Sequence, residues 1–257
     1  MLRQNLIDCI NEHHARGAFL IKDLRSGETV AFHEAEVVPS ASLIKLFILV
    51  RAFEAIRDGK AALTDEVPVN AKDIVAFSVL EFLKPRAYQL EELLRLMIVY
   101  SDNTATNILM DHFGIDAINE TIKGLGYSAS VLQRKMMDFK AAEEGRQNYT
   151  SVNEMADLLE RLYSGKLLGE PYDEQMLEIM KGQADETMMR QELPDELVIA
   201  RKSGELDALD HDVAIVYTEQ GDYIYVFFAW EAEDNNRARD ILSITSKMVY
   251  EDFINKN

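Results

Sequence analysis

The stretch LVIARKSGELDALDHDVAIVYTEQGDYIYVFFAW, residues 197–230, decides the fold class of this chain. It holds three runs rich in β-branched and aromatic residues, LVIARKSG (197–204), VAIVYTE (213–219) and YIYVFFAW (223–230), a composition typical of strands. The last two runs are separated by Gln220, Gly221 and Asp222, which form a tight turn signal. We therefore predict three successive strands near the C-terminal end, the last two joined as a hairpin.

Two more strands are predicted near the other end of the chain. GAFLIKDL (17–24) and ETVAFHE (28–34) flank a turn at residues 25–27, and a short helix precedes them. Between residues 70 and 190 the apolar spacing is helical, notably at 88–100, 103–113, 115–125 and 152–163, and a last helix is expected at about 235–254. Strands at both ends with helices between them predict an α/β fold of the α+β type: a five-stranded antiparallel sheet flanked by helices, with an inserted all-helical lobe.

The domain organisation follows from this order of elements. We expect one domain over residues 1–257, with an α/β lobe formed by 1–57 and 195–257 and a helical lobe formed by 58–194. No internal repeat or low-complexity linker separates the lobes. A cleft between them is the expected place for a site.

Charge narrows the classes of partner. The chain carries 45 acidic and 27 basic residues, a formal net charge of −18, which repels nucleic acid and anionic membranes. We expect a small-molecule substrate, no cofactor, no metal and a monomer. The single cysteine, Cys9, excludes an intrachain disulfide.

The N-terminal residues bear on location. MLRQNLIDCINEHHARG lacks the roughly 7–15 residue apolar run of a secretory signal, and no segment reaches the ~18 apolar residues of a membrane span. The sequence as given predicts a cytoplasmic protein; a trimmed sequence would instead be compatible with a secreted or periplasmic one.

A possible nucleophile lies at the start of a strongly apolar helix, residues 42–57. Ser42 and Lys45 are three residues apart, so their side chains share a helix face. Burial in this helix disfavours the charged amine and lowers the pKa of Lys45, which makes a neutral lysine a plausible proton acceptor for Ser42. Free N–H groups at the helix start would stabilise an oxyanion. By itself the pair would favour an N-cap serine and a lysine that extends to solvent.

Two further strings accompany this pair. Ser101, Asp102 and Asn103 lie between two predicted helices, and Lys202, Ser203 and Gly204 end a predicted strand. A cation, a hydroxyl and a residue without a side chain suit close docking of a substrate carboxylate. The alternatives are an interhelix N-cap for the first string and an exposed strand end for the second.

Taken together in this order, S-x-x-K, S-D-N and K-S-G resemble the motif set of class A β-lactamases and low-molecular-weight penicillin-binding proteins. The resemblance spans nearly the whole chain. It implies Ser42 as nucleophile, Ser101 as proton relay, Asn103 as a contact to the substrate amide, Asp102 as the residue that holds its loop, and the backbone N–H of Glu205 as second oxyanion donor. Lys45 and Lys202 complete the catalytic set, and Ser203 and Gly204 the binding set.

One part of the family pattern is missing. The family β-lactamases carry, in an omega-shaped loop, a glutamate that activates the deacylating water. Arg134 matches the opening arginine of this loop, but residues 135–138 are Lys, Met, Met and Asp. Asp138 is the leading substitute and Glu144 the second. Asn148 replaces the acidic partner of Arg134, so we expect a looser loop neck.

Three activities fit these observations. The first is a serine hydrolase that forms an acyl-enzyme with β-lactams and hydrolyses the ring amide, with slow deacylation. The second is a D-alanyl carboxypeptidase or esterase-like acyl enzyme acting on an acyl-D-alanyl-like substrate. The third is a penicillin-binding sensor that acylates without turnover. The triplet at 210–212 (Asp, His, Asp) could suggest a metal, but adjacent residues alternate in direction, so we predict a turn there.

Overall fold

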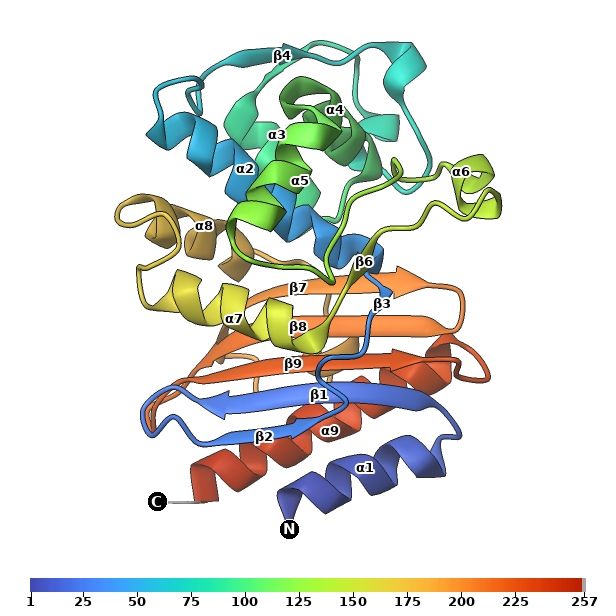
Figure 1. Ribbon diagram of the computed structural model, residues 1–257, viewed down its shortest axis with the longest axis vertical. Helices are drawn as coiled ribbons and strands as arrows, with labels where there is room; N and C mark the ends of the chain where they lie inside the picture. The colour runs from blue at the N-terminus through green and yellow to red at the C-terminus, as the bar shows by residue number, and fades with distance from the viewer. Residues whose placement is uncertain (256–257) are drawn as a thin grey trace.

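The computed structural model describes residues 1–255 and contains the predicted five-stranded sheet (Figure 1). Its strand order is β2-β1-β9-β8-β7, and every neighbouring pair is antiparallel. The strands are β1 (Arg16–Asp23), β2 (Thr29–Phe32), β7 (Val198–Leu206), β8 (Leu209–Tyr217) and β9 (Tyr223–Trp230). β1 pairs with β9, from Arg16 opposite Trp230 to Asp23 opposite Tyr223, so both ends of the chain build the centre of one sheet.

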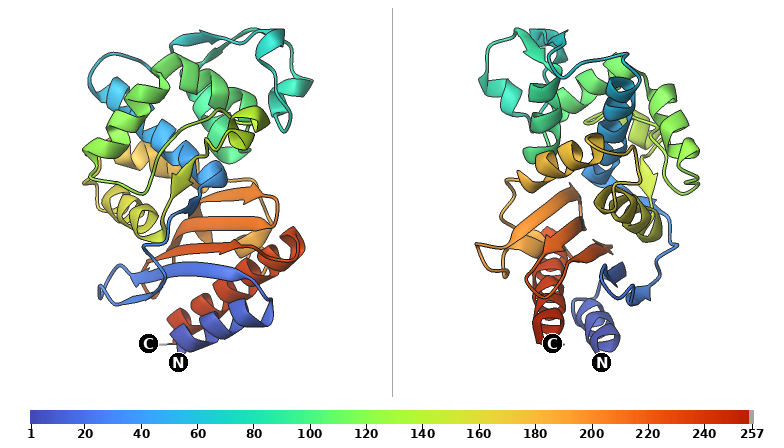
Figure 2. Two further views of the ribbon diagram at one scale, coloured as in Figure 1. Left: turned by 45° about the vertical axis from the view of Figure 1, so that its right-hand side comes forward. Right: turned by 90° about the vertical axis from the view of Figure 1, so that its left-hand side faces the viewer.

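The two faces of the sheet bury different sets of side chains, as the two-residue period of a strand requires. On one face Phe19, Tyr225 and Phe227 pack against the terminal helices α1 (Leu2–Glu12) and α9 (Asn235–Asn255). On the other face, alternate residues such as Val226 and Phe228 join the core of the helical lobe. The sheet therefore shares one hydrophobic core with the helices above it, and the two lobes pack directly on each other (Figure 2).

The helical lobe contains the four helices predicted for it, α3 (Leu90–Val99), α4 (Asn103–Phe113), α5 (Ile115–Gly124) and α7 (Val152–Tyr163). It also contains α8 (Tyr172–Lys181) and the short α6 (Phe139–Glu143), which were not predicted. α7 lies along β1, β8 and β9, and α8 contacts β7. The short 3-10 turns are η1 (Ala41–Ile44), η2 (Ala71–Asp73), η3 (Val79–Phe82) and η4 (Met188–Arg190).

The boundary between the lobes differs from the predicted one. α2 (Lys45–Arg57) packs against α3, α4, α5 and α8, so it belongs to the helical lobe although the prediction assigned residues up to 57 to the α/β lobe. The helix is buried on nearly all sides, as predicted, and this all-round apolar character gave no indication of which lobe covers it.

Two small ladders were not predicted. β3 (Val38–Pro39) pairs with β6 (Tyr149–Thr150), and β4 (Glu66–Pro68) pairs with β5 (Ala87–Gln89). The first ladder ties the segment before Ser42 to the end of the omega-like segment. The turn predicted at residues 210–212 was wrong: all three residues lie inside β8, where Asp212 pairs with Phe227 and Ser203. No helix within residues 1–255 is both long and apolar enough to cross a membrane.

Candidate active site

A pocket of about 770 Å³ lies where the helical lobe meets the β7 edge of the sheet. It is lined by the three serines of the three motifs, Ser42, Ser101 and Ser203, and by Asn103 and Gly204. The structure thus brings together residues separated by more than 160 positions in the chain, as the prediction of a cleft between the lobes required.

Ser42 occupies the short turn η1 that leads into α2. The residue before it, Ala41, has a left-handed φ of 47°, a conformation uncommon for alanine that turns the chain sharply into the helix. On the opposite side, Gly204 of β7 lies against this turn: a Cβ at Gly204 would be 3.1 Å from the Ser42 nitrogen and 3.1 Å from the Ala41 Cβ. The absence of a side chain at Gly204 therefore lets β7 approach the start of the helix.

Lys45 lies inside the protein beneath the pocket. Its Nζ donates to the Ser101 carbonyl at 2.6 Å, to Ser101 Oγ at 3.0 Å and to Asn103 Oδ1 at 3.0 Å. Burial, followed by the nearby Lys202 cation, holds the pKa of Lys45 well below its usual range, as predicted. Within residues 1–255 its hydrogen bonds run to the S-D-N motif and not to Ser42, whose hydroxyl it was expected to meet.

Ser101 connects the two buried lysines. Its Oγ accepts from Lys45 Nζ and from Lys202 Nζ, each at 3.0 Å, and its φ of 53° places it in the left-handed region. Because a hydroxyl that accepts two hydrogen bonds still carries its own proton, Ser101 can donate toward the pocket. The predicted role of Asp102 is confirmed, since its buried carboxylate caps α4 at Ala105 and accepts from Ser78 and Val79, which fixes the loop.

Lys202 is fully buried in β7. Besides Ser101, its Nζ donates to the Ser203 carbonyl at 2.6 Å. Burial lowers the pKa of Lys202 to about 7, against the opposing effect of Asp185 and Asp212. The lysine expected to dock a substrate carboxylate thus lies behind the pocket surface, in contact with the proton-relay serine.

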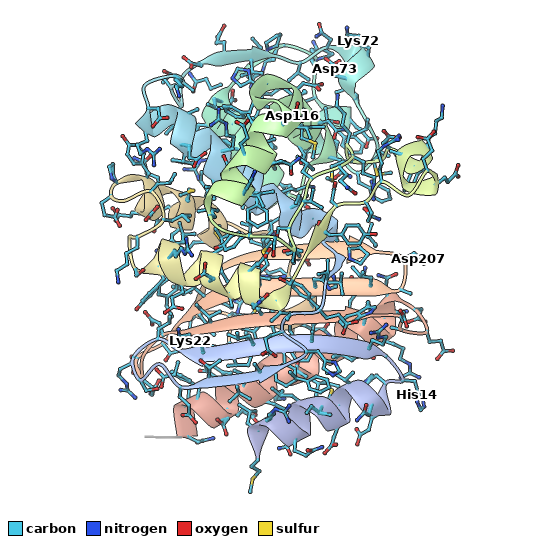
Figure 3. All side chains as sticks on the ribbon, viewed as in Figure 1. His14, Lys22, Lys72, Asp73, Asp116 and Asp207 are labelled. Carbon is cyan, nitrogen blue, oxygen red and sulfur yellow. The ribbon has the colours of Figure 1, made fainter. Side chains whose placement is uncertain are left out.

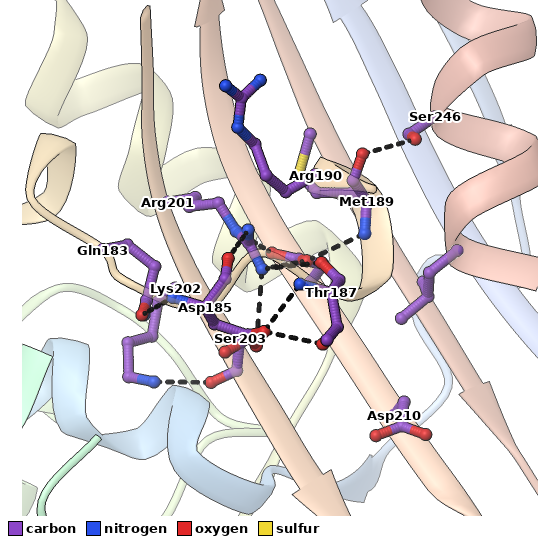
Figure 4. A network of polar contacts seen from close by, with 12 residues as sticks. Gln183, Asp185, Thr187, Met189, Arg190, Arg201, Lys202, Ser203, Asp210 and Ser246 are labelled. Carbon is purple, nitrogen blue, oxygen red and sulfur yellow. Dashed lines mark hydrogen bonds and ion pairs between the residues drawn. The ribbon is translucent and has the colours of Figure 1, made fainter. Parts of the chain in front are cut away.

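Beside Lys202 lies a polar network that the sequence analysis missed (Figure 4). Arg201 pairs with Asp212 through two contacts, Nε to Oδ1 at 3.2 Å and Nη2 to Oδ2 at 2.9 Å, and both side chains are almost fully buried. Arg201 also donates to the Asp185 carbonyl at 2.6 Å. Asp185 in turn lines the pocket. In the sequence, Arg201 beside the K-S-G lysine was the one indication of a charged network. Its partner, Asp212, is revealed only by the register of β7 with β8.

The omega-like segment places its carboxylates away from Ser42. Asp138 is exposed and caps α6 at the Ala141 N–H, and Glu144 pairs with Arg146 at the surface. Neither lines the pocket within the described residues. Capping holds the Asp138 carboxylate at the start of α6, which counts against its predicted role as the water-activating base.

Three apolar residues of this segment, Met136, Met137 and Phe139, line the pocket instead. The Met136 backbone is held by Asn107, which donates Nδ2 to the Met136 carbonyl at 3.1 Å and accepts the Met136 N–H at 2.8 Å. The neck of the segment is also closed, contrary to the expected loosening. Asn148 Oδ1 accepts the Arg134 N–H at 3.0 Å and Nδ2 donates to the Arg134 carbonyl at 3.1 Å, so the Asn148 amide closes the neck through the backbone. The Arg134 guanidinium instead donates Nε to Gln147 Oε1 at 2.9 Å.

The remaining predicted binding residues lie at the pocket. Asn103 bonds Lys45 through Oδ1 and the Ala76 carbonyl through Nδ2 at 3.2 Å. Glu205 lies next to Gly204 on β7, and its side chain pairs with Arg239 at 2.6 Å. Both residues line the pocket, which places the Glu205 backbone on the same edge as the start of the nucleophile helix.

Comparisons with known proteins agree with this geometry. Residues 1–253 match the model of the Beta-lactamase enzyme family. The chain is 23% identical to Beta-lactamase OXY-2 of Klebsiella oxytoca, over 97% of this chain and 89% of that protein, and 28% identical to a Beta-lactamase of Rhodobacter capsulatus, over 80% and 72%. Among solved structures, PBP-A is 26% identical, with a TM-score of 0.90 over 98% of this chain and 96% of that one. A point mutant of PBP-A, with a TM-score of 0.89, is described as an acyl-enzyme complex with penicillin G.

Proposed function

Since this chain belongs to the Beta-lactamase enzyme family and has a class A β-lactamase-like hydrolase fold, we propose that it is a serine acyl-transfer enzyme whose nucleophile is Ser42. The observation that carries the proposal is the convergence of two buried lysines on the Ser101 hydroxyl in the pocket that Ser42 lines. Buried amines with depressed pKa values can exchange protons near neutral pH, which the chemistry of a serine nucleophile requires.

In the proposed acylation, Ser42 Oγ attacks the carbonyl carbon of a β-lactam or an activated ester. The Ser42 proton passes to the neutral amine of Lys45, which in that form donates at most two of its three hydrogen bonds to Ser101 and Asn103. The carbonyl oxygen becomes an oxyanion stabilised by the N–H groups of Ser42 and Glu205. When the C–N or C–O bond breaks, Ser101 delivers its proton to the leaving atom and is reprotonated by Lys45 or Lys202. The product is an ester on Ser42.

Deacylation is proposed to be slow. Hydrolysis of the ester needs a water positioned and deprotonated by a base within hydrogen-bond reach. In the described residues of the omega-like segment the two candidate carboxylates are engaged elsewhere, and the pocket carries Met136 in their place. This favours an enzyme with a persistent acyl state, which a D-alanyl carboxypeptidase, an esterase-like enzyme or a penicillin-binding sensor would share.

Intact-mass spectrometry over time after mixing with penicillin G tests both the assignment of Ser42 as nucleophile and the slow deacylation. We expect one adduct of the mass of the intact penicillin, formed quickly and lost slowly, and no adduct on Ser42→Ala. A Ser42→Ala protein that is still labelled to the same extent would refute the nucleophile. A wild-type adduct that disappears as fast as it forms would refute slow deacylation alone.

A further inference from the structure

We propose that Asn235, at the start of α9, is a positioning residue that holds the Glu205 N–H in place as an oxyanion donor. This role rests on the proposed acyl-transfer function and adds to it a residue from outside the three motifs. Three features support it: the turn that follows Glu205, the contacts of the Asn235 amide, and a second contact from the same helix.

The first feature is the turn between β7 and β8. Only Asp207 and Ala208 connect the two strands, and Figure 3 shows Asp207 at this turn. Ala208 has a left-handed φ of 53°, whereas Asp207 does not have a left-handed φ. The two-residue turns that match the twist of a hairpin are left-handed at the first position or at both, so this turn tends to splay its strands. It therefore needs support from outside the hairpin.

The second feature is the side chain of Asn235, which supplies this support. Its Oδ1 accepts the Ala208 N–H at 3.2 Å. Its Nδ2 donates to the Leu206 carbonyl at 2.7 Å and to Oδ2 of the buried Asp210 at 3.0 Å. These acceptors engage both amide protons, which fixes the orientation of the amide. Asn235 thus binds the residue that follows Glu205 in the chain and the residue that pairs with Glu205 across the ladder.

The third feature is a contact from the same face of α9. Arg239 lies one helical turn after Asn235, and its Nη2 binds Glu205 Oε2 at 2.6 Å. Arg239 Nε and Asp210 Oδ1 are both buried without a hydrogen-bond partner and lie 4.0 Å apart, so Arg239 does not replace Asn235 as the partner of Asp210. The helix therefore holds this edge through the backbone at Asn235 and through the Glu205 side chain at Arg239.

The path from this contact to the reacting atoms is short. Asn235 and Glu205 both line the pocket, and Gly204, next to Glu205, lies against the Ser42 nitrogen. If the turn splayed, the Glu205 N–H would move relative to the Ser42 N–H. An oxyanion requires its donors at about 2.7–3.1 Å, so this movement should slow the chemical step without weakening the initial binding of substrate.

Covalent labelling by a fluorescent penicillin over a range of concentrations tests this inference, because it separates the maximal acylation rate from the apparent dissociation constant. We expect Asn235→Ala to lower the maximal rate roughly tenfold, a part of the about 10²–10³ lost with a whole donor, and to change the dissociation constant by less than about twofold. Asn236→Ala is the matched control, since Asn236 is the exposed next residue of the same helix. It should acylate at the wild-type rate.

Phenylboronic acid gives an independent readout of the oxyanion donors. Ser42 Oγ bonds to its boron, the Ser42 proton passes to Lys45, and the boronate becomes a tetrahedral anion that resembles the acylation intermediate. Its inhibition constant should rise in Asn235→Ala by about the factor by which the acylation rate falls. Melting temperatures of the same samples identify a loss of stability, which alone would change neither readout.

Two results with a folded Asn235→Ala protein would overturn the inference. One is acylation within about twofold of the wild-type rate. The other is a loss of penicillin affinity at an unchanged maximal rate, which would make Asn235 a direct substrate contact. If Asn235→Ala fails to fold, Arg239→Gln replaces it: we expect a roughly threefold lower maximal rate at an unchanged dissociation constant, and wild-type acylation would overturn the inference. Absence of Ser42-dependent labelling in the wild type would overturn the proposed function as well.

Discussion

Replacement of Gly204 by alanine tests how closely β7 must approach the nucleophile. Gly204 does not have a left-handed φ, so an alanine would cause no backbone strain; its cost is steric. The new Cβ would lie 3.1 Å from the Ser42 nitrogen, 3.1 Å from the Ala41 Cβ and 3.4 Å from the Leu43 Cγ. The first two distances are shorter than ordinary van der Waals contact, so the strand and the turn must separate by a few tenths of an ångström.

The expected loss of acylation rate depends on which groups this separation displaces. The Ser42 N–H and the Glu205 N–H are the two proposed oxyanion donors, one on each side of the contact, and loss of one such donor typically lowers a rate by about 10²–10³. A partial displacement should lower the acylation rate by roughly 10- to 100-fold. Overpacking costs about 1–3 kcal/mol of stability, which lowers the melting temperature by roughly 2–4 °C per kcal/mol in a chain of this size.

The assay is the rate of covalent labelling by a fluorescent penicillin, with thermal unfolding measured on the same samples. Gly124→Ala is the matched control, because no atom lies within 4 Å of a Cβ built there and its φ is not left-handed. It should label at the wild-type rate. A folded Gly204→Ala protein that labels within about twofold of the wild type would refute the claim that the contact positions the oxyanion donors.

Three further predictions follow from the buried lysines and the omega-like segment. The acylation rate should rise with pH, with a midpoint well below the pKa of ~10.4 of a free lysine, because burial and Lys202 lower the pKa of Lys45. An acylation rate that is flat from pH 5 to 9 and unchanged in Lys45→Met would contradict this prediction. The pKa of Lys202 is about 7 when folded and ~10.4 when unfolded, so the unfolded chain binds the proton more tightly between these values. The free energy of unfolding should therefore increase from pH 7 to pH 10 more in the wild type than in Lys202→Met, as urea titrations at both pH values can show, and an equal increase would count against the depressed pKa. Turnover of a chromogenic cephalosporin should show a burst near one equivalent followed by a slow phase. Met136→Glu should accelerate this slow phase by about 10-fold or more, whereas Asp138→Asn and Glu144→Gln should leave its rate unchanged. A slower phase in Asp138→Asn would support Asp138 as the water-activating base.

The sheet and the three motifs could be predicted because their signals are local. Strands such as residues 223–230 consist mostly of β-branched and aromatic residues, and Ser42 and Lys45 of the S-x-x-K string are separated by a single turn at a helix start. The partner of Arg201 could not be predicted, because it depends on the register in which β7 pairs with β8. The error at residues 210–212 has a related cause. Asp210 and Asp212 at the start of β8 have partners on other elements, Asn235 and Arg201, so this part of a strand has the charged composition that is typical of a turn.

The omega-like segment shows a different limit of prediction. Alignment from Arg134 assigned residues 135–138 to the part of the loop where the family has its glutamate. It could not show the direction in which the side chains of these residues point. Asp138 turned out to cap a five-residue helix that has too little periodicity to be recognised in advance. Met136 is held at the pocket by Asn107, 29 positions earlier in the chain, which donates one hydrogen bond to the Met136 carbonyl and accepts one from the Met136 N–H.

The pairing of β1 with β9 has a consequence for how the protein is made. These central strands lie at opposite ends of the sequence, so the sheet closes only after the whole helical lobe has been synthesised. Contacts of such long sequence separation slow folding, and they leave early chains with unpaired strand edges, which favour aggregation. The nucleophile emerges more than 150 residues before the K-S-G strand that completes its pocket. A nascent chain should therefore remain unreactive toward penicillin until its C-terminal strands are released, which makes covalent labelling a direct reporter of the final folding step.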